Sequence, residues 1–211
     1  MWKNSAPTVD LLIEDAKKAA PDFQRKCLLI AKLTASRASF GPEDKMICKS
    51  KASMERKILQ DMESSGMSED RALERLSDAL RGSIIASRPE QIPQIVTMIQ
   101  KLFDGYSDKV VFKNFWTDEK DSGYVGLHAK ILFPVRENGK KSNEEKFVIA
   151  EIQIHLDSIM NGSHESVKER EQLLYEKVRK GPTDLHRVSA ASTLLYLSAL
   201  KQVPGLKNEK D

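Results

Sequence analysis

Cysteine is nearly absent from this sequence of 211 residues. Its two cysteines, Cys27 and Cys48, lie in no Cys-x-x-Cys motif and have no accompanying histidine pattern, which argues against a zinc site. So few thiols are typical of a protein that works in a reducing compartment. The expected localisation is therefore the cytoplasm.

Long apolar runs are also missing. No segment approaches the roughly 20 apolar residues that a membrane span needs, and residues 1–3 do not open a secretory signal. We therefore expect no membrane partner. A hydrophobic fraction of 40% and a charged fraction of 31% indicate a globular chain, and its length suits one domain with additional helices.

Charge of one sign is not in large excess. The net charge of +3 gives no strong nucleic-acid signal. A local basic cluster nevertheless occurs, and two interpretations of it stay open: a solvated helix face or an anion site. The cluster consists of Lys45, Lys49, Lys51, Arg56 and Lys57.

Apolar residues at helical spacing predict helices over residues 8–35, 52–62, 68–80, 90–103, 156–179 and 183–200. Pro21 should break the first of these into two helices. Ser65-Gly66 should end the helix over 52–62, and Ser68 or Asp70 should cap the next one.

Strand patterns occupy the middle of the chain, at residues 82–86, 109–115, 124–134 and 146–155. Asn138-Gly139 is a strong turn signal, so the last two strands should form a hairpin with a long polar loop. The predicted fold class is α/β (α+β), with a mixed sheet of four to five strands, helices on one side, and extra N- and C-terminal helices.

Polar residues that suit nucleotide chemistry stand at the predicted strand edges. Asp78 precedes the strand at 82–86, and Glu151 begins a Glu-x-Gln sequence on the last strand. Magnesium prefers carboxylate oxygens, which this pair would supply if the two strands are neighbours. Asp78 could instead be a helix-terminal polar residue, and Glu151 an outward residue on a half-exposed strand.

Gly123-Tyr124 is a second candidate motif. The Tyr124 ring can stack on a purine, and Gly123 lets a ligand approach the backbone closely. Tyr124 could instead be an aromatic residue of the core.

These motifs resemble the synthetase domain of RelA/SpoT-type alarmone synthetases over roughly residues 45–180. The resemblance rests on the Gly-Tyr-x-x-Leu-His sequence at 123–128, on the Glu-x-Gln sequence, and on the Asp before an apolar strand. Lys113 lies eleven positions before Tyr124, as the family's lysine does. Lys49, Ser53 and Lys57 match the spacing of the family's basic motif.

The resemblance implies a nucleotidyltransferase-like fold that transfers pyrophosphate from ATP to the ribose 3′-hydroxyl of GDP or GTP. It implies Mg²⁺ as cofactor, held by Asp78 and Glu151, and ATP, ADP and purine nucleotides as partners. Lys49 and Lys57 would bind the ATP phosphates, and Arg56 would add a planar cation.

Further roles follow for the acceptor side. By resemblance, Lys113 would lie near the acceptor phosphates or the transferred group, and Tyr124 would stack on the acceptor base. His128 shares a strand face with Tyr124 and could bind a ribose or a phosphate. Gln153 would orient the ligand or the base. Arg81 is a further candidate because it lies one helical turn from Asp78.

Several cations of the family's pattern are missing. Ser83, His155 and Ile47 stand where the family has arginines, and Asn114-Phe115 replaces its Asp-Tyr. The loss of one such group often lowers the rate by ~10²–10³. No hydrolase HD motif is present, so the pattern fits a small synthetase-only protein or an effector or toxin relative, the latter secreted into a host cell.

Three hypotheses therefore stand. The chain is an active pyrophosphokinase-like enzyme, or a catalytically degenerate nucleotide-binding module of a multidomain bacterial effector, or a protein-interaction domain that uses its terminal helices. The predicted domains are an N-terminal helical extension (1–44), a RelA/SpoT-like core (45–180), and a C-terminal helix and tail (181–211).

Overall fold

A computed structural model describes residues 2–41, 47–103, 110–115, 126–137, 140–141 and 146–160. Its helices are α1 (Val9–Leu33), α2 (Lys51–Ser65), α3 (Glu69–Arg75), α4 (Gln91–Leu102) and α5 (Asp157–Met160). Its strands are β1 (Arg37–Ser39), β2 (Leu80–Ala86), β3 (Val110–Asn114), β4 (Leu127–Pro134), β5 (Arg136–Glu137), β6 (Lys140–Lys141) and β7 (Phe147–Leu156).

Five strands form one mixed sheet in the order β1-β2-β7-β4-β3. β2 and β7 are parallel, and the other neighbours are antiparallel. The predicted mixed sheet and the predicted pairing of the last two long strands are confirmed. The loop between β4 and β7 carries the small β5–β6 ladder; the expected turn residues Asn138 and Gly139 lie outside the described residues.

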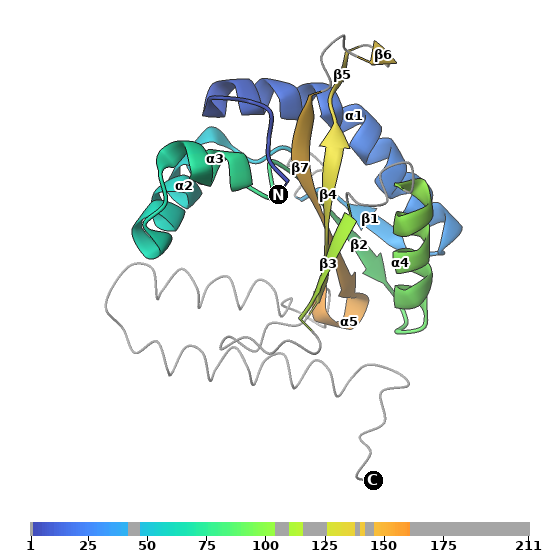
Figure 1. Cartoon of the computed structure of the whole chain (residues 1–211). Coiled ribbons are helices and arrows are strands. Elements are labelled where there is room, and N and C mark those ends of the chain that lie inside the picture. The colour runs from blue at the N-terminus through green and yellow to red at the C-terminus, as the bar shows by residue number, and fades with distance from the viewer. Residues whose placement is uncertain are drawn as a thin grey trace, which may run out of the picture.

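The two faces of the sheet differ in polarity because strand residues alternate between them. One face is apolar and is covered by aromatic side chains. Phe133 of β4 packs edge-to-face against Phe23 of α1 and Phe103 after α4, with ring centroids 5.7 and 5.9 Å apart. Figure 1 shows α4 on one side of the sheet and α2 and α3 on the other. The core therefore lies on the α1 and α4 side, and the opposite face is left for polar residues.

α1 is a single helix, so the predicted break at Pro21 is wrong. Proline costs a helix interior about 3 kcal/mol. On either side of Pro21, however, one stripe of α1 is buried against the sheet. Burial of such a stripe outweighs the missing hydrogen bond. The stripe consists of Leu12, Ala16, Ala19, Ala20, Phe23, Cys27 and Ile30.

The predicted end of α2 and start of α3 are confirmed, whereas the end of α3 differs from the prediction. Gly66 ends α2 in the left-handed conformation (φ 63°), and the Ser68 side chain caps α3 by accepting the Arg71 N–H. α3 ends at Arg75, earlier than predicted, because the chain turns into β2 at Leu80. β1 was not predicted from its short polar sequence. The rest of the predicted helix over 156–179, and the one over 183–200, lie outside the described residues beyond α5.

Asn4 joins three segments that are distant in sequence. Its side-chain amide donates to the carbonyls of Leu73 and Leu76, both at 2.9 Å, and its Oδ1 accepts the Ile149 N–H at 2.8 Å. The residue is 2% exposed, so these bonds satisfy a buried polar group. The N-terminal segment is thereby fixed to β7 and to the chain leading from α3 into β2.

No described helix combines the length and the apolar character that crossing a bilayer requires.

We predict that Phe23→Ala lowers the free energy of unfolding by about 3–5 kcal/mol, because it opens a cavity beside Phe133. Leu28→Ala on the same helix is the matched control, since Leu28 is 50% exposed and should matter little. Urea unfolding measures both variants. Equal effects for the two substitutions would contradict the assignment of the buried face.

Candidate functional site

Asp78 lies between two lysines at the entrance to β2. Its Oδ2 accepts the Lys49 ammonium at 2.5 Å, and its Oδ1 accepts the Lys57 ammonium at 3.0 Å. The Asp78 and Lys49 side chains are 14% and 9% exposed, so the pair is shielded from solvent. The basic cluster therefore does more than cover a helix with charge: two of its lysines meet on one carboxylate.

Backbone pairing places Lys49. Residues 47–49 run antiparallel to the start of β2, with the Lys49 N–H donating to Ala79 O (3.0 Å) and the Arg81 N–H donating to Ile47 O (2.9 Å). Lys57 arrives separately, from α2, where Met54 and Ile58 are buried and fix the rotation of the helix. Two independent elements thus converge on Asp78.

Glu151 lies at the centre of a row of charged residues across the sheet. Its register partner on β2 is Arg81, and its partner on β4 is Lys130. Cross-strand partners share a face, so the carboxylate has a cationic residue on the strand at either side. Because β2 and β7 are adjacent, the predicted condition for Asp78 and Glu151 to act together is met.

Glu151 is 8% exposed and hydrogen-bonded on both oxygens. Gln153 Nε2 donates to Oε1 at 2.9 Å, and His128 Nδ1 lies 3.4 Å from Oε2. Burial by itself would raise the pKa of Glu151, but these two partners outweigh it and hold the pKa below its ordinary value of 4.5. Glu151 is therefore ionised at neutral pH, despite the nearby charge of Asp78.

A second row follows one step along the strands. Gln153 pairs in register with Ser83 on β2 and with His128 on β4, and His128 pairs with Lys113 on β3. His155, only 1% exposed, lies 3.5 Å from Gln153 Oε1 through its Nε2. The polar face thus carries a connected chain of side chains that ends at Glu151.

Among the residues that the structure describes, cations outnumber carboxylates on this face. Burial opposes ionisation of Asp78, yet Lys57 and Lys49 together hold its pKa below 3.8. Burial lowers the pKa of Lys49, as do the charges of Lys57 and Arg81, and Asp78 compensates only in part. A partly desolvated excess of positive charge is the property of a site for a polyanion such as a triphosphate.

The residues of this face also fit a divalent cation. Asp78 and Glu151 supply hard oxygen ligands, and the charge of Asp78 acts to raise the pKa of Glu151. No cluster of three or more His, Cys, Asp or Glu ligands occurs in the described part of the chain. Magnesium needs only one or two carboxylates when phosphate oxygens and water complete its octahedron.

The structure brings most of the predicted site residues together, with two differences. Arg81 does not lie one helical turn from Asp78, because it belongs to strand β2. The sheet register places it next to Glu151. Arg56 is exposed on α2 and takes no part in the Asp78 cluster among the described contacts. Ser53 lies in the first turn of α2, where its hydroxyl accepts from Ser50 at 3.0 Å. Gly123 and Tyr124 lie outside the described residues.

Sequence reasoning missed Lys130 and Ser77. Lys130 Nζ donates to Ser77 Oγ at 2.8 Å, within the same polar face. The signal for Lys130 was present, because strand alternation places residue 130 on the face of His128. Ser77 had no signal, since its position depends on where α3 ends.

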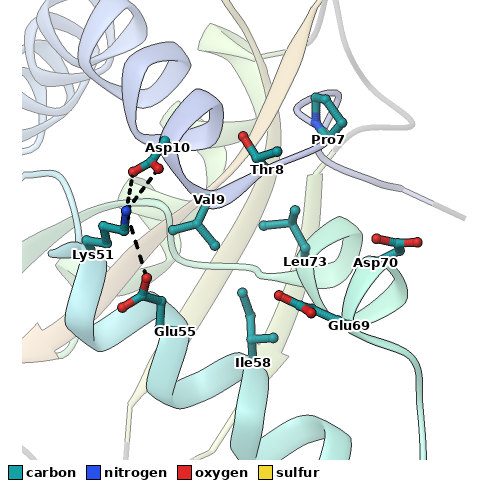
Figure 2. A pocket seen from close by; sticks show the side chains of 10 residues that line it. All are labelled: Pro7, Thr8, Val9, Asp10, Lys51, Glu55, Ile58, Glu69, Asp70 and Leu73. Atoms are coloured by element: carbon teal, nitrogen blue, oxygen red, sulfur yellow. Dashed lines mark hydrogen bonds and ion pairs between the residues drawn. The ribbon is translucent and has the colours of Figure 1, made fainter.

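A separate cavity of about 230 Å³ lies between the start of α1, α2 and α3 (Figure 2). Val9, Ile58 and Leu73 form its apolar part, and the Lys51 ammonium bridges Asp10 and Glu55 at its edge (Figure 2). None of the predicted site residues lines it, so it is not the site described above.

Neither a protein-family profile nor a curated protein sequence matches the chain. Solved structures do resemble it. Small alarmone synthetase 1 from Bacillus subtilis, bound to its product pppGpp, has a TM-score of 0.56 at 20% identity and covers 91% of this chain and 94% of its own. A GTP pyrophosphokinase family protein from Streptococcus pneumoniae has a TM-score of 0.59 at 16% identity (90% and 87% covered). The Type VI effector Tas1, solved with its immunity protein, has a TM-score of 0.58 at 15% identity (91% and 96%). The fold expected from the sequence motifs is confirmed.

We predict that Asp78→Asn destabilises the protein by about 3 kcal/mol, because it leaves the buried Lys49 without a counter-charge. Asp10→Asn is the control: the Asp10–Lys51 pair is solvent-exposed, and its loss should leave unfolding unchanged. Chemical denaturation at neutral pH compares the two. A D78N variant as stable as D10N would contradict the inferred dependence of Lys49 on Asp78.

The depressed pKa of Asp78 also predicts a pH dependence. A carboxylate with a lowered folded-state pKa contributes stability that is complete above its unfolded value of 3.8 and is lost as the pH falls through the lower folded value. The stability difference between wild type and D78N should therefore shrink below pH 3.8. Denaturant titrations over an acid pH series measure it, and a difference independent of pH would refute the assignment.

Proposed function

We propose that this chain, which has the fold of the small alarmone synthetases, binds purine nucleotides on the polar face of its sheet. We further propose that it transfers pyrophosphate from Mg-ATP to a ribose 3′-hydroxyl. One observation carries the proposal: Asp78, held between Lys49 and Lys57, lies beside the strand whose neighbour presents Glu151.

The donor triphosphate is assigned to the Asp78 side of the face. Lys49 and Lys57 bring two ammonium groups to this point, and Arg81 adds a guanidinium nearby, since its charge acts on Lys49. Ammonium groups bind phosphate oxygens as point charges, and guanidinium groups bind them through a planar fork. When ATP binds, its phosphates would take over part of the role that Asp78 now plays for the two lysines.

The acceptor nucleotide is assigned to the β3–β4 side. Lys113 and His128 are register partners there, and His128 is in contact with Glu151. Lys113 would bind the acceptor phosphates, and Tyr124 would stack on the base. Glu151, ionised and oriented by Gln153, can accept a hydrogen bond from the attacking 3′-hydroxyl.

Asp78 and Glu151 would hold Mg²⁺ if the cofactor binds here. Bound there, Mg²⁺ would supply charge neutralisation for the phosphate groups. The side chains of the chain itself orient the reactants: Gln153 fixes the Glu151 carboxylate, and Ser77 fixes Lys130.

A second function remains a candidate because of particular substitutions. Ser83, His155 and Ile47 stand where the family's pattern has arginines, and the Ile47 carbonyl is used to pair with β2. A catalytically degenerate nucleotide-binding or interaction module of an effector would keep the carboxylates and lysines but make no product. Calorimetric titration that shows nucleotide binding without turnover would favour it.

The division of the chain into three domains, with boundaries at residues 44/45 and 180/181, also stays a proposal. α1 falls in the predicted extension, yet it packs on the sheet of the core through Phe23. We therefore propose that the extension folds together with the core.

We predict that the wild-type chain converts labelled ATP and at least one of GDP, GTP, ADP or AMP to a 3′-pyrophosphorylated product. Glu151→Gln should lower this rate roughly 100-fold or more, since an amide cannot replace the carboxylate charge. Glu74→Gln, in an exposed pair with Lys3, is the control and should be fully active. Thin-layer chromatography of the products measures the reaction. A failure to form product with any acceptor at any magnesium concentration would reject the proposed transfer activity.

A further inference from the structure

Lys130 is a charged residue of the polar face that the sequence motifs do not assign. It belongs to β4, where it pairs in register with Glu151 on β7 and with Val111 on β3. Its side chain is half-buried, and its ammonium donates to the Ser77 hydroxyl at 2.8 Å. Lys130 is thus fixed in position next to Glu151 by an uncharged partner.

No carboxylate among the described residues lies within ion-pair distance of Lys130. Gln153 and His128 occupy the oxygens of Glu151, and the two lysines of the donor side occupy those of Asp78. Burial and the charge of Lys113 lower the pKa of Lys130, and the attraction of Glu151 opposes them only in part. Holding an ammonium in such a place costs free energy that a bound anion would offset.

The position of Lys130 indicates which anion it would bind. It lies close enough to Glu151, Asp78, Lys57 and Lys113 for each of their charges to act on it. In the sheet its strand lies between β7 and β3, the strand of Lys113, and its ammonium bonds to Ser77, the residue before Asp78. It therefore lies between the carboxylate that holds the donor-side lysines and the lysine assigned to the acceptor side. In a transfer reaction this is the region that the migrating group occupies.

The sheet register supports the same position. Ser83 and His155 replace two arginines of the family's pattern; Ser83 lies in the row of Gln153, and His155 one step beyond it. Arg81 and Lys130 lie in the adjacent row, on the two strands that flank Glu151, and Lys113 lies in the row of Gln153. Arg81 and Lys130 therefore place positive charge on both sides of Glu151, one row nearer to Asp78 than Ser83 is.

From this geometry we propose that Lys130 is a catalytic residue that binds the non-bridging oxygens of the pyrophosphoryl group during its transfer. The inference rests on the proposed function and adds a residue to it. The ribose 3′-oxygen bonds to the β-phosphorus, the bond from that phosphorus to the α-phosphate oxygen breaks, and AMP leaves with this oxygen. The 3′-hydroxyl proton passes to a basic group or water. Lys130 keeps its proton throughout and supplies hydrogen bonds and charge.

The test uses the full chain and compares Lys130→Met with Lys130→Arg. The control is Lys101→Met, an exposed lysine on α4, on the other side of the sheet (Figure 1). Calorimetry with inorganic pyrophosphate and Mg²⁺ measures binding. We expect K130M to bind roughly 10- to 100-fold more weakly than wild type, K130R to recover most of the affinity, and K101M to match wild type.

Thermal unfolding without ligand separates this role from a structural one. Because no residue that the structure describes forms an ion pair with Lys130, K130M should unfold at the wild-type temperature or above it. A structural residue would show the opposite, a lowered midpoint in K130M with unchanged pyrophosphate affinity, and that result would overturn the proposal. If K130M does not fold, Lys130→Gln, which can still bond to Ser77, replaces it in the same measurements.

Kinetics distinguishes this inference from the proposed function. If wild type forms product, K130M should lower kcat at least 10-fold and leave the KM of the acceptor nearly unchanged. If wild type forms no product but K130M still loses pyrophosphate binding, the transfer reaction is rejected while Lys130 remains a pyrophosphate-binding residue. Wild type that fails to bind pyrophosphate, or K130M that binds it as wild type does, refutes the role of Lys130.

Discussion

The contact of Asp78 with Lys49 and Lys57 is the interaction on which the polar face depends. It joins the segment 47–49, helix α2 and the entrance to β2, which approach from different parts of the chain. A shielded carboxylate between two ammonium groups is stable only while all three remain in place. The same arrangement leaves the face with surplus positive charge, because one carboxylate serves two lysines. The structural support of this face and its surplus positive charge thus have one origin.

The division of labour between the sheet faces explains how so much charge is tolerated. On one face, Phe23, Phe103 and Phe133 supply the burial that stabilises the domain. On the other, charged and polar residues stand in register across β2, β7 and β4, where each is adjacent to a partner of complementary charge or hydrogen-bonding character. The apolar face stabilises the sheet, and the polar face can therefore be specialised for a ligand.

Sequence reasoning succeeded where a local pattern determines the outcome. Strand patterns correctly predicted β2, β3, β4 and β7, and β2 and β7 are neighbours, as the prediction of a joint role for Asp78 and Glu151 requires. It failed where tertiary packing decides. The burial of α1 overrides Pro21, and the early end of α3 moves Arg81 from a helix to a strand. Lys130 was overlooked because no motif includes it, although alternation from His128 would have indicated it.

Asn4 has a consequence for how local opening of the amino-terminal segment would spread through the molecule. One of its bonding partners, Ile149, belongs to β7, the strand that carries Glu151. The other two, Leu73 and Leu76, belong to the stretch that leads to Asp78. Detachment of the segment around Asn4 would therefore leave buried backbone groups unpaired at two places at once, beside Asp78 and on the strand of Glu151.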